Sequence, residues 1–402
     1  MELKKNMEEN KGELAEQYVA ELIYASYLKY WCYPNPMDIE GDYKEICDLL
    51  ICFREVAIII SVKNYSFNGN YERYKKKVVS KSTDQLNGAE RKLFFSDREI
   101  VIQHPERAPE VFDRRRYSKA FKITVNAGEQ FENYALSDEK SGKGIVSIVN
   151  KETFEVMVAE LDTMPDLIEY LLAREEFLLA HPKAIFNFTE KDLIAIFLMH
   201  ARIFPDKLIT SINDTDESAI KGLWERYHHG RQAQSKRAAN QISYLIDGLV
   251  EHEVLRVRNG ESIARELMQL SRTERRMFSE TLVGLVHRYQ YIPDAVARSY
   301  SEFNGIGYLM MYYPLGQRSE SVDFILQKAM EIYVHKYAPA SGKVLLLAVS
   351  AGLTGWKFGL FEAAIGVDPI ALAQLETLAR AYGWFTDMTR TEYTEKEYPL
   401  EE

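Results

Sequence analysis

The stretch that decides the fold reads Lys44-Glu45-Ile46-Cys47-Asp48-Leu49-Leu50-Ile51-Cys52-Phe53, and after a short polar link it continues as Val56-Ala57-Ile58-Ile59-Ile60-Ser61-Val62-Lys63. Two apolar runs of this length, rich in isoleucine and valine, predict a pair of neighbouring β-strands. Asp48 opens the first run and Lys63 closes the second. We therefore expect both side chains to project from adjacent strands near one edge of a sheet.

The elements around this strand pair predict an α/β protein. Residues 12–28 show helical periodicity before the pair, and a basic helical stretch follows at residues 71–95. Further strands are expected at residues 99–103, 121–125 and 145–149. An order of helix, strand, strand, helix and strand is typical of an α/β layer structure.

The length of 402 residues favours two or three domains. We expect a first domain over residues 1–180, a mainly helical region over 185–300 and a mixed α/β region over 301–402. Two helices of the second region are expected to begin with capping signals, at Thr189 and at Ser271.

The last hundred residues predict a small βαβ layer. Strands are expected at residues 306–313 and 343–350, with a helix between them at 319–337. Asp368 and Pro369 then predict the start of a final helix, because Asp is a favoured N-cap and Pro a favoured first helical residue.

Composition limits the classes of function. The net charge of −10 excludes a general nucleic-acid coat, because phosphate binding needs local positive charge, although basic groups can still gather on one face. The three cysteines are too few for a disulfide scaffold. The first residues lack the apolar segment of a secretory signal, and the longest apolar stretch, 344–349, is too short to cross a bilayer. We therefore expect a cytoplasmic protein without a membrane partner.

The two strands bring together groups that suit phosphodiester hydrolysis. Ser61 and Lys63 share one face of a strand, because side chains alternate, and Asp48 can face them from the neighbouring strand. Lys63 could stabilise the pentavalent phosphate or lower the pKa of the attacking water. Glu16 on the first helix and Gln85 on the basic helix could close the site from either side.

A divalent cation is the cofactor that this set of side chains predicts. Mg²⁺, or Mn²⁺ in its place, prefers hard oxygen ligands and accepts only a few of them from protein. Asp48, one further acid and the Val62 carbonyl would be sufficient.

These residues, in this order of elements, resemble the PD-(D/E)XK or restriction-endonuclease-like superfamily over roughly residues 10–105. In that superfamily a helical Glu is followed by a strand bearing Asp, a strand ending in (Asp/Glu)-x-Lys, and a helix often bearing Gln or Lys. The matching residues here are Glu16, Asp48, Lys63 and Gln85. The resemblance implies a central four- to five-stranded mixed sheet flanked by helices, and metal-dependent cleavage of DNA, less often of RNA.

The chain departs from the superfamily pattern at Ser61, where Asp or Glu is usual and where serine is a poor metal ligand. Either the missing acid is supplied by Glu45, Glu16 or Glu72, or the site has lost catalysis. We favour the first alternative, with Glu45 and Glu16 joining Asp48 as metal ligands. The second would leave an inactive nuclease-fold module that binds nucleic acid or a protein partner.

The basic helical stretch is the expected nucleic-acid-binding surface. Its lysines are Lys75, Lys76, Lys77 and Lys81, although a run of lysines is most often only a solvated face. The chain has no motor or methylase motif, so such a nuclease would act alone, as a homo-oligomer or with separately encoded partners. Defence against phage or foreign DNA is the setting suggested by analogy with the superfamily.

Overall fold

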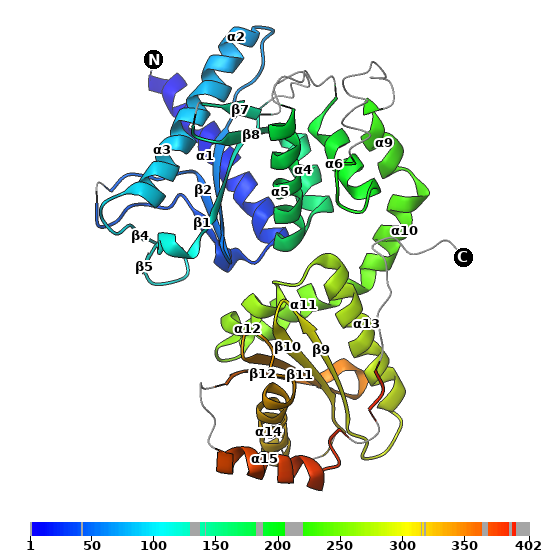
Figure 1. Ribbon diagram of the computed structural model, residues 1–402. Helices are drawn as coiled ribbons and strands as arrows, with labels where there is room; N and C mark the ends of the chain where they lie inside the picture. Colours follow the sequence, from blue (N-terminus) through cyan, green and yellow to red (C-terminus); the bar gives the residue numbers. More distant parts are fainter. Residues whose placement is uncertain are drawn as a thin grey trace. The chain divides into compact units, whose positions relative to one another are not determined.

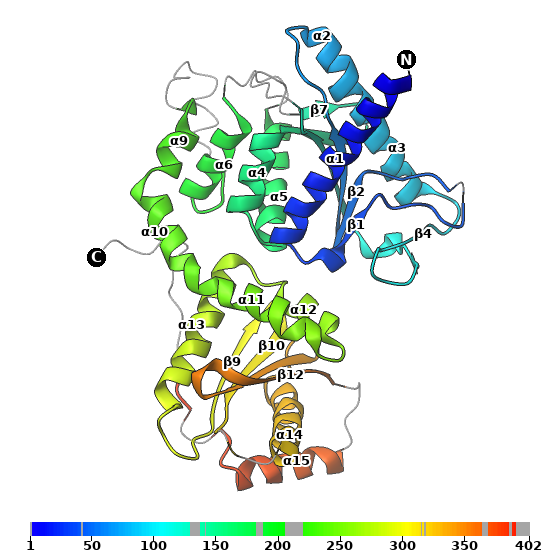
Figure 2. The same ribbon diagram turned by 180° about the vertical axis from the view of Figure 1, so that it is seen from behind.

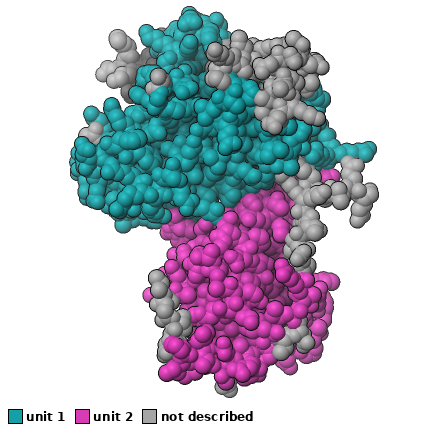
Figure 3. All heavy atoms as spheres, viewed as in Figure 1, with its two compact units in different colours: residues 1–233 teal, residues 234–402 magenta. Residues whose placement is uncertain are grey.

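The computed structural model describes residues 2–41, 43–128, 137–140, 142–181, 188–205, 220–314, 316, 319–363, 369–385 and 388–390. The chain divides into two compact units, Met1–Ala233 and Gln234–Glu402 (Figure 3). The boundary falls inside the region 185–300, so the helices expected there are shared between the units. The division into three domains stays a prediction.

Unit 1 is built around a six-stranded mixed sheet with the strand order β1-β2-β3-β6-β8-β7. The strands are β1 (Cys32–Pro34), β2 (Leu49–Phe53), β3 (Val56–Lys63), β6 (Lys119–Asn126), β7 (Ser137–Glu139) and β8 (Ile145–Asn150). The central strands β3, β6 and β8 are parallel, whereas β1, β2 and β7 pair in antiparallel fashion. The predicted fold class, a mixed sheet flanked by helices, is confirmed, with six strands rather than four or five.

Two helices cover opposite faces of this sheet. Figures 1 and 2, which view the molecule from opposite sides, show α3 (Lys81–Phe95) over one face and α1 (Glu2–Ser26) over the other. Because side chains alternate along a strand, Ile59 of β3 packs in one buried cluster with Leu86 of α3. This alternation directs Ser61 and Lys63 toward the α3 side as well.

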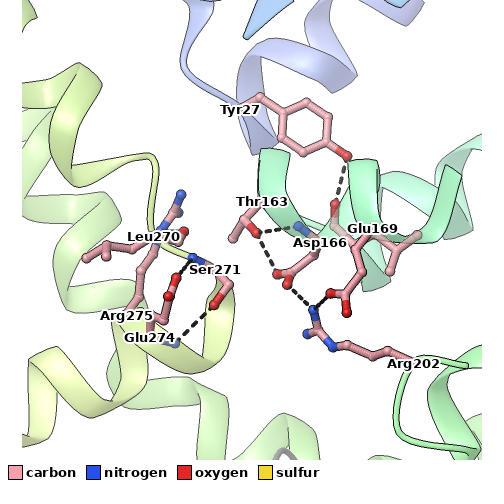
Figure 4. Close-up of polar contacts among 10 residues, drawn as sticks. Tyr27, Thr163, Asp166, Glu169, Arg202, Leu270, Ser271, Glu274 and Arg275 are labelled. Carbon is pink, nitrogen blue, oxygen red and sulfur yellow. Dashed lines mark hydrogen bonds and ion pairs between the residues drawn. The ribbon is translucent and has the colours of Figure 1, made fainter. Parts of the chain in front are cut away.

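The remaining helices of unit 1 follow the sheet in sequence. They are α4 (Lys151–Glu160), α5 (Met164–Ala180), α6 (Glu190–Met199), α9 (Leu223–His228) and α10 (Arg231–Asn240), the last of which contains the boundary between the units. The hydroxyl of Tyr27 donates to the Leu161 carbonyl at 2.8 Å, which ties α1 to the end of α4 (Figure 4). At the start of α5, Asp166 accepts from Thr163 at 2.5 Å and from Arg202 at 2.5 Å.

The basic stretch differs in detail from the single helix expected over residues 71–95. It consists of α2 (Tyr71–Tyr74), a π-helical turn (Lys75–Ser80) and then α3. The wider turn lets the adjacent residues Val78 and Val79 both enter a buried cluster with Tyr74, while the lysines before them stay exposed.

The strand expected over residues 99–103 is only the short β4 (Val101–Ile102). It pairs with β5 (Glu110–Val111) and lies outside the six-stranded sheet. A short apolar run carries no information about its pairing partner, which here depends on the contacts of the connecting segment.

Unit 2 contains the predicted βαβ layer. The strands β10 (Ile306–Tyr312) and β11 (Lys343–Ser350) are parallel and are joined through α14 (Ser319–Tyr337). The antiparallel strands β9 (Ala297–Phe303) and β12 (Thr354–Glu362) extend the sheet to four. The helices before it are α11 (Tyr244–His252), α12 (Gly260–Leu267) and α13 (Arg272–Tyr289), and α15 (Pro369–Ala381) follows it. The expected cap Asp368 lies outside the described residues.

Both predicted capping boxes are present. In α6 the Thr189 side chain accepts from the Asp192 backbone amide, and in α13 the Ser271 side chain accepts from that of Glu274 at 3.3 Å (Figure 4). The Glu274 carboxylate accepts in return from the Ser271 amide at 2.7 Å. Among the described helices none has the length and apolar composition needed to cross a membrane.

Candidate functional site

Asp48, Ser61 and Lys63 converge at one end of the paired strands β2 and β3. The Lys63 ammonium lies 3.7 Å from Asp48 Oδ2 and 2.6 Å from Ser61 Oγ. Ser61 Oγ in turn donates to Asp48 Oδ2 at 3.1 Å. The predicted approach of a carboxylate and an ammonium from adjoining strands is therefore present, and the serine hydroxyl lies between them.

The register of the strand pair explains this convergence. Leu49 pairs with Ile60, so Asp48, one residue before β2, lies opposite Ser61. The Val62 backbone amide also donates to Asp48 Oδ2. Oδ1 takes part in neither bond, which leaves one carboxylate oxygen of Asp48 outside this anchoring.

Glu45 reaches the same place from the segment before β2. A β-bridge to Met37 and a 2.9 Å bond from the Ile46 amide to the Pro36 carbonyl hold this segment. Partial withdrawal from water, followed by the charge and hydrogen bonding of Asp48, raises the pKa of Glu45 to about 7. The negative charge of Asp48 thus disfavours ionisation of the neighbouring Glu45 carboxyl.

Glu16 approaches from α1, on the other side of the strands. Burial raises its pKa, and the charge of Asp48 adds to this effect, whereas the nearby Lys63 charge opposes it. Three acids were considered as substitutes for the acid missing at position 61. Of these, Glu45 and Glu16 lie close enough to Asp48 for their charges to interact with it. Glu72 lies exposed on α2.

Lys63 is held between opposing influences. Burial lowers its pKa, and the Lys81 charge at the start of α3 acts in the same direction, while Asp48 and Glu16 raise it. Its ammonium also donates to the Val62 carbonyl at 3.0 Å. The carbonyl that sequence reasoning assigned to a metal therefore already accepts from Lys63.

A pocket of about 340 Å³ lies beside these groups, between the strands and α3. Its polar lining includes Lys44, Glu45, Asp48, Ser61, Gln85 and Lys92. Gln85 of α3 lines this pocket together with the acids Glu45 and Asp48, on the helical face that also carries Gly88 and Lys92. The volume is within the lower range of small-ligand sites.

Sequence reasoning did not identify Lys44 and Lys92 as pocket residues. Lys92 follows Gln85 by seven residues, two helical turns, and this spacing was the available signal. Its ammonium lies 3.2 Å from the buried carboxylate of Asp38. Lys44 directly precedes Glu45, and only the irregular path of the chain before β2 brings it to the pocket.

The predicted nucleic-acid-binding lysines, Lys75, Lys76, Lys77 and Lys81, are all exposed. Lys81 is close enough to influence Lys63, and the other three occupy the π-helical turn that precedes α3. The π-helical turn therefore lies directly before α3, the helix that lines the pocket.

The donor set fits a hard divalent cation that takes most of its ligands from water and substrate. Asp48 and Glu45 supply carboxylate oxygens, and Mg²⁺ commonly binds through only one or two carboxylates. In the described ranges, no group of three His, Cys, Asp or Glu side chains lies close enough to hold a metal. Glu16 is therefore near the pair without completing a three-residue cage.

The raised pKa of Glu45 predicts a specific dependence of stability on pH. Between its ordinary value of 4.5 and about 7, the folded chain binds a proton that the unfolded chain has lost. The contribution of Glu45 to stability is therefore present at low pH and is lost as the pH rises through this window. We expect Glu45→Gln to raise the melting temperature above pH 7 by a few degrees and to leave it unchanged near pH 4, measured in EDTA.

The control for this measurement is Glu253→Gln, at an exposed glutamate in unit 2. It should leave the melting temperature unchanged at every pH. A Glu45→Gln effect of equal size at pH 4 and pH 8 would contradict a raised pKa of Glu45 in the folded chain.

Comparison of the chain with protein-family models, with curated proteins and with solved structures gives no match.

Proposed function

We propose that this chain is a metal-dependent nuclease that hydrolyses phosphodiester bonds of DNA. The observation that supports the proposal best is the approach of Lys63 to within 3.7 Å of Asp48, with Glu45 in contact with the same carboxylate. Glu45 and Asp48 line a pocket, and the Lys63 ammonium lies beside them. A carboxylate pair with a neighbouring ammonium is suited to binding a cation and a phosphate together.

The protein groups have distinct roles in this proposal. When bound, Mg²⁺ or Mn²⁺ would polarise a phosphoryl oxygen and favour ionisation of a water. Asp48 and Glu45 would hold the ion, with Asp48 Oδ2 anchored by the Val62 amide. Lys63 would donate a hydrogen bond to a phosphate oxygen as negative charge develops on it. Gln85 would orient the bound strand, and Glu16 would add negative potential from the opposite side.

The acid expected at position 61 is supplied by Glu45 in this account. Glu45 lies beside Asp48, and with a pKa of about 7 the Glu45 carboxyl is partly protonated at neutral pH. Binding of the cation and loss of the Glu45 proton are therefore linked.

A second candidate is a catalytically inactive nuclease-fold module that binds nucleic acid or a protein. The observations that favour it are Ser61 itself and the lack of a three-residue acidic or histidine cluster among the residues that the structure describes. Such a module would keep the pocket and the exposed lysines but would not cleave DNA.

The setting rests on the resemblance to the PD-(D/E)XK superfamily. We infer a cytoplasmic enzyme that acts on phage or foreign DNA, by itself, as a homo-oligomer or with separately encoded partners. RNA is the alternative substrate, and the cleavage assay described next distinguishes RNA from DNA.

The test is cleavage of plasmid DNA, linear DNA and RNA by the purified full chain with Mg²⁺, Mn²⁺ or EDTA. We expect cleavage of DNA that requires the cation and is absent in EDTA. Lack of cleavage with either cation, together with retained DNA binding, would favour the inactive module.

The π-helical lysines should set the affinity for DNA rather than the chemistry. Replacing Lys75, Lys76 and Lys77 with glutamine removes up to three phosphate contacts, each worth a slope of about 0.9 in log K against log salt. We expect weaker binding and a salt slope reduced by roughly 2–3, measured by fluorescence anisotropy at several salt concentrations.

A charge-matched control replaces three other exposed residues, Arg231, Arg256 and Arg258, with glutamine. The control should keep the salt slope of the parent chain. An equal loss in both triple variants would show that net charge alone governs binding, and it would contradict a local binding surface at the π-helical turn.

A further inference from the structure

Ser61 occupies the centre of the candidate site. It lies in β3 between the two charged groups, and only 3% of it is exposed. Its oxygen is 2.6 Å from the Lys63 ammonium and 3.1 Å from Asp48 Oδ2, whereas those two charged groups are 3.7 Å apart. Each charged group therefore lies closer to the hydroxyl than to the other charged group, and the hydroxyl is within hydrogen-bond distance of both.

The hydrogen-bond roles at Ser61 follow from chemistry. An ammonium only donates and an ionised carboxylate only accepts. The hydroxyl must therefore accept from Lys63 and donate its single hydrogen to Asp48. The bridge orients both partners, because the single hydroxyl hydrogen of Ser61 points to Asp48 and a lone pair of its oxygen faces Lys63.

The arrangement also decides which hydrogen of Lys63 reaches a substrate. One ammonium hydrogen is used by Ser61 Oγ and a second by the Val62 carbonyl at 3.0 Å. Asp48 at 3.7 Å lies beyond hydrogen-bond distance. Within the described part of the chain, the third hydrogen is left to donate to an oxygen of a bound phosphate.

A neutral residue at this position suits the charges around it. Lys63 is faced by Asp48 from the start of β2, by Glu16 from α1 and by Lys81 from α3, and Asp48 is in contact with Glu45. Another carboxylate would add a like charge to these acids and would pair directly with the ammonium. Serine supplies an acceptor for Lys63 without either effect.

We propose that Ser61 is a positioning residue of this site, whose hydroxyl bridges Lys63 and Asp48 and aims the ammonium at the scissile phosphate. The inference rests on the nuclease function proposed above. It assigns to Ser61 an active role, in contrast to the interpretation of this residue as the mark of a lost metal ligand.

The experiment compares Ser61→Ala and Ser61→Thr with the parent chain in the cation-dependent cleavage assay. A displacement of about 1 Å at a reacting group can cost about 10²-fold, so we expect Ser61→Ala to lower kcat about 10- to 100-fold. The KM for DNA should change by less than about twofold, since ground-state binding is not altered. Threonine restores the hydroxyl and should restore kcat to within about threefold.

The matched control is Ser82→Ala. Ser82 is fully buried in α3, and its hydroxyl lies 2.8 Å from that of Thr124. This variant loses a buried hydroxyl of the same kind outside the bridge, so kcat should be unchanged. Equal losses of kcat in Ser61→Ala and Ser82→Ala would reduce the role of Ser61 to general packing and overturn the proposal.

A second readout does not depend on catalysis. Crystal structures of the parent chain and of Ser61→Ala should show the Lys63 ammonium moved by about 1 Å or more when the hydroxyl is removed. An unmoved ammonium would overturn the inference. If the parent chain does not cleave, the proposed nuclease function fails, while the two structures still test the bridge.

The variant Ser61→Asp separates the two interpretations of position 61. We expect it to cleave no faster than the parent chain, because the added charge disturbs the bridge. An inactive parent chain that gains cleavage in Ser61→Asp would overturn the positioning role and support the inactive module.

Discussion

Asp48→Asn should abolish cation-dependent cleavage. The amide keeps the size of the side chain and an oxygen that accepts from the Val62 amide and from Ser61, so the local fold is preserved. It removes the negative charge that holds the cation, and metal-derived stabilisation of several kcal/mol corresponds to a loss of about 10³-fold or more in kcat. Cleavage is measured by initial rates and Mn²⁺ binding by titration calorimetry. Both cleavage and Mn²⁺ binding should be lost.

The control for this substitution is Asp138→Asn. Asp138 lies in β7 and accepts from Thr83 at 2.7 Å, so it makes a comparable hydrogen bond outside the site. It should retain full activity and full Mn²⁺ binding. If Asp48→Asn cleaves at the rate of the parent chain, Asp48 is not a ligand of the catalytic ion.

Lys63→Met should remove catalysis while leaving the cation in place. Methionine has a similar length and no charge, and the loss of a preorganised donor to a developing negative charge typically costs about 10²- to 10³-fold in kcat. Removal of the ammonium also removes a repulsive charge beside Asp48 and Glu45, so Mn²⁺ should bind at least as tightly as in the parent chain. Stopped cleavage with retained ion binding distinguishes Lys63 from the acids.

Lys119→Met is the matched control for Lys63. In the parallel pair of β3 and β6, Lys119 pairs with Val56 at one end and Asn126 with Lys63 at the other, so Lys119 lies at the far end of the same strands. It should keep kcat. We assign Lys63 to the phosphate. Loss of Mn²⁺ binding in Lys63→Met would contradict this assignment and would show that Lys63 maintains the ion site.

The approach of Asp48 to Ser61 and Lys63 could be predicted because the alternation of side chains along a strand is strict. Side chains alternate with a period of two, so Ser61 and Lys63 had to share a face. The two-residue link between Phe53 and Val56 fixed the register that brought Asp48 opposite them. Neither inference needed any contact from outside the strand pair.

The rest of the site depends on contacts that no local pattern encodes. Glu45 reaches Asp48 through a β-bridge to Met37 in an irregular segment. Lys44 enters the pocket by the same path, and Lys92 enters it from α3. The hydroxyl bridge at Ser61 could not be predicted either, because the sequence marked this position only as a missing acid.

The same contrast holds for the fold. The βαβ layer of unit 2 and both capping boxes follow from local periodicity and from residues three apart. The π-helical turn and the pairing of β4 with β5 depend on the packing of neighbouring elements, which becomes visible only in the folded chain.

Crystals of the parent chain grown with Mn²⁺ provide the most direct test of the proposed ion site. An anomalous difference map should show one peak bonded to carboxylate oxygens of Asp48 and Glu45, with the Lys63 ammonium adjacent but not coordinated. A map with no peak at these carboxylates at saturating Mn²⁺, or with the ion bound elsewhere while the crystals retain cleavage activity, would contradict the account.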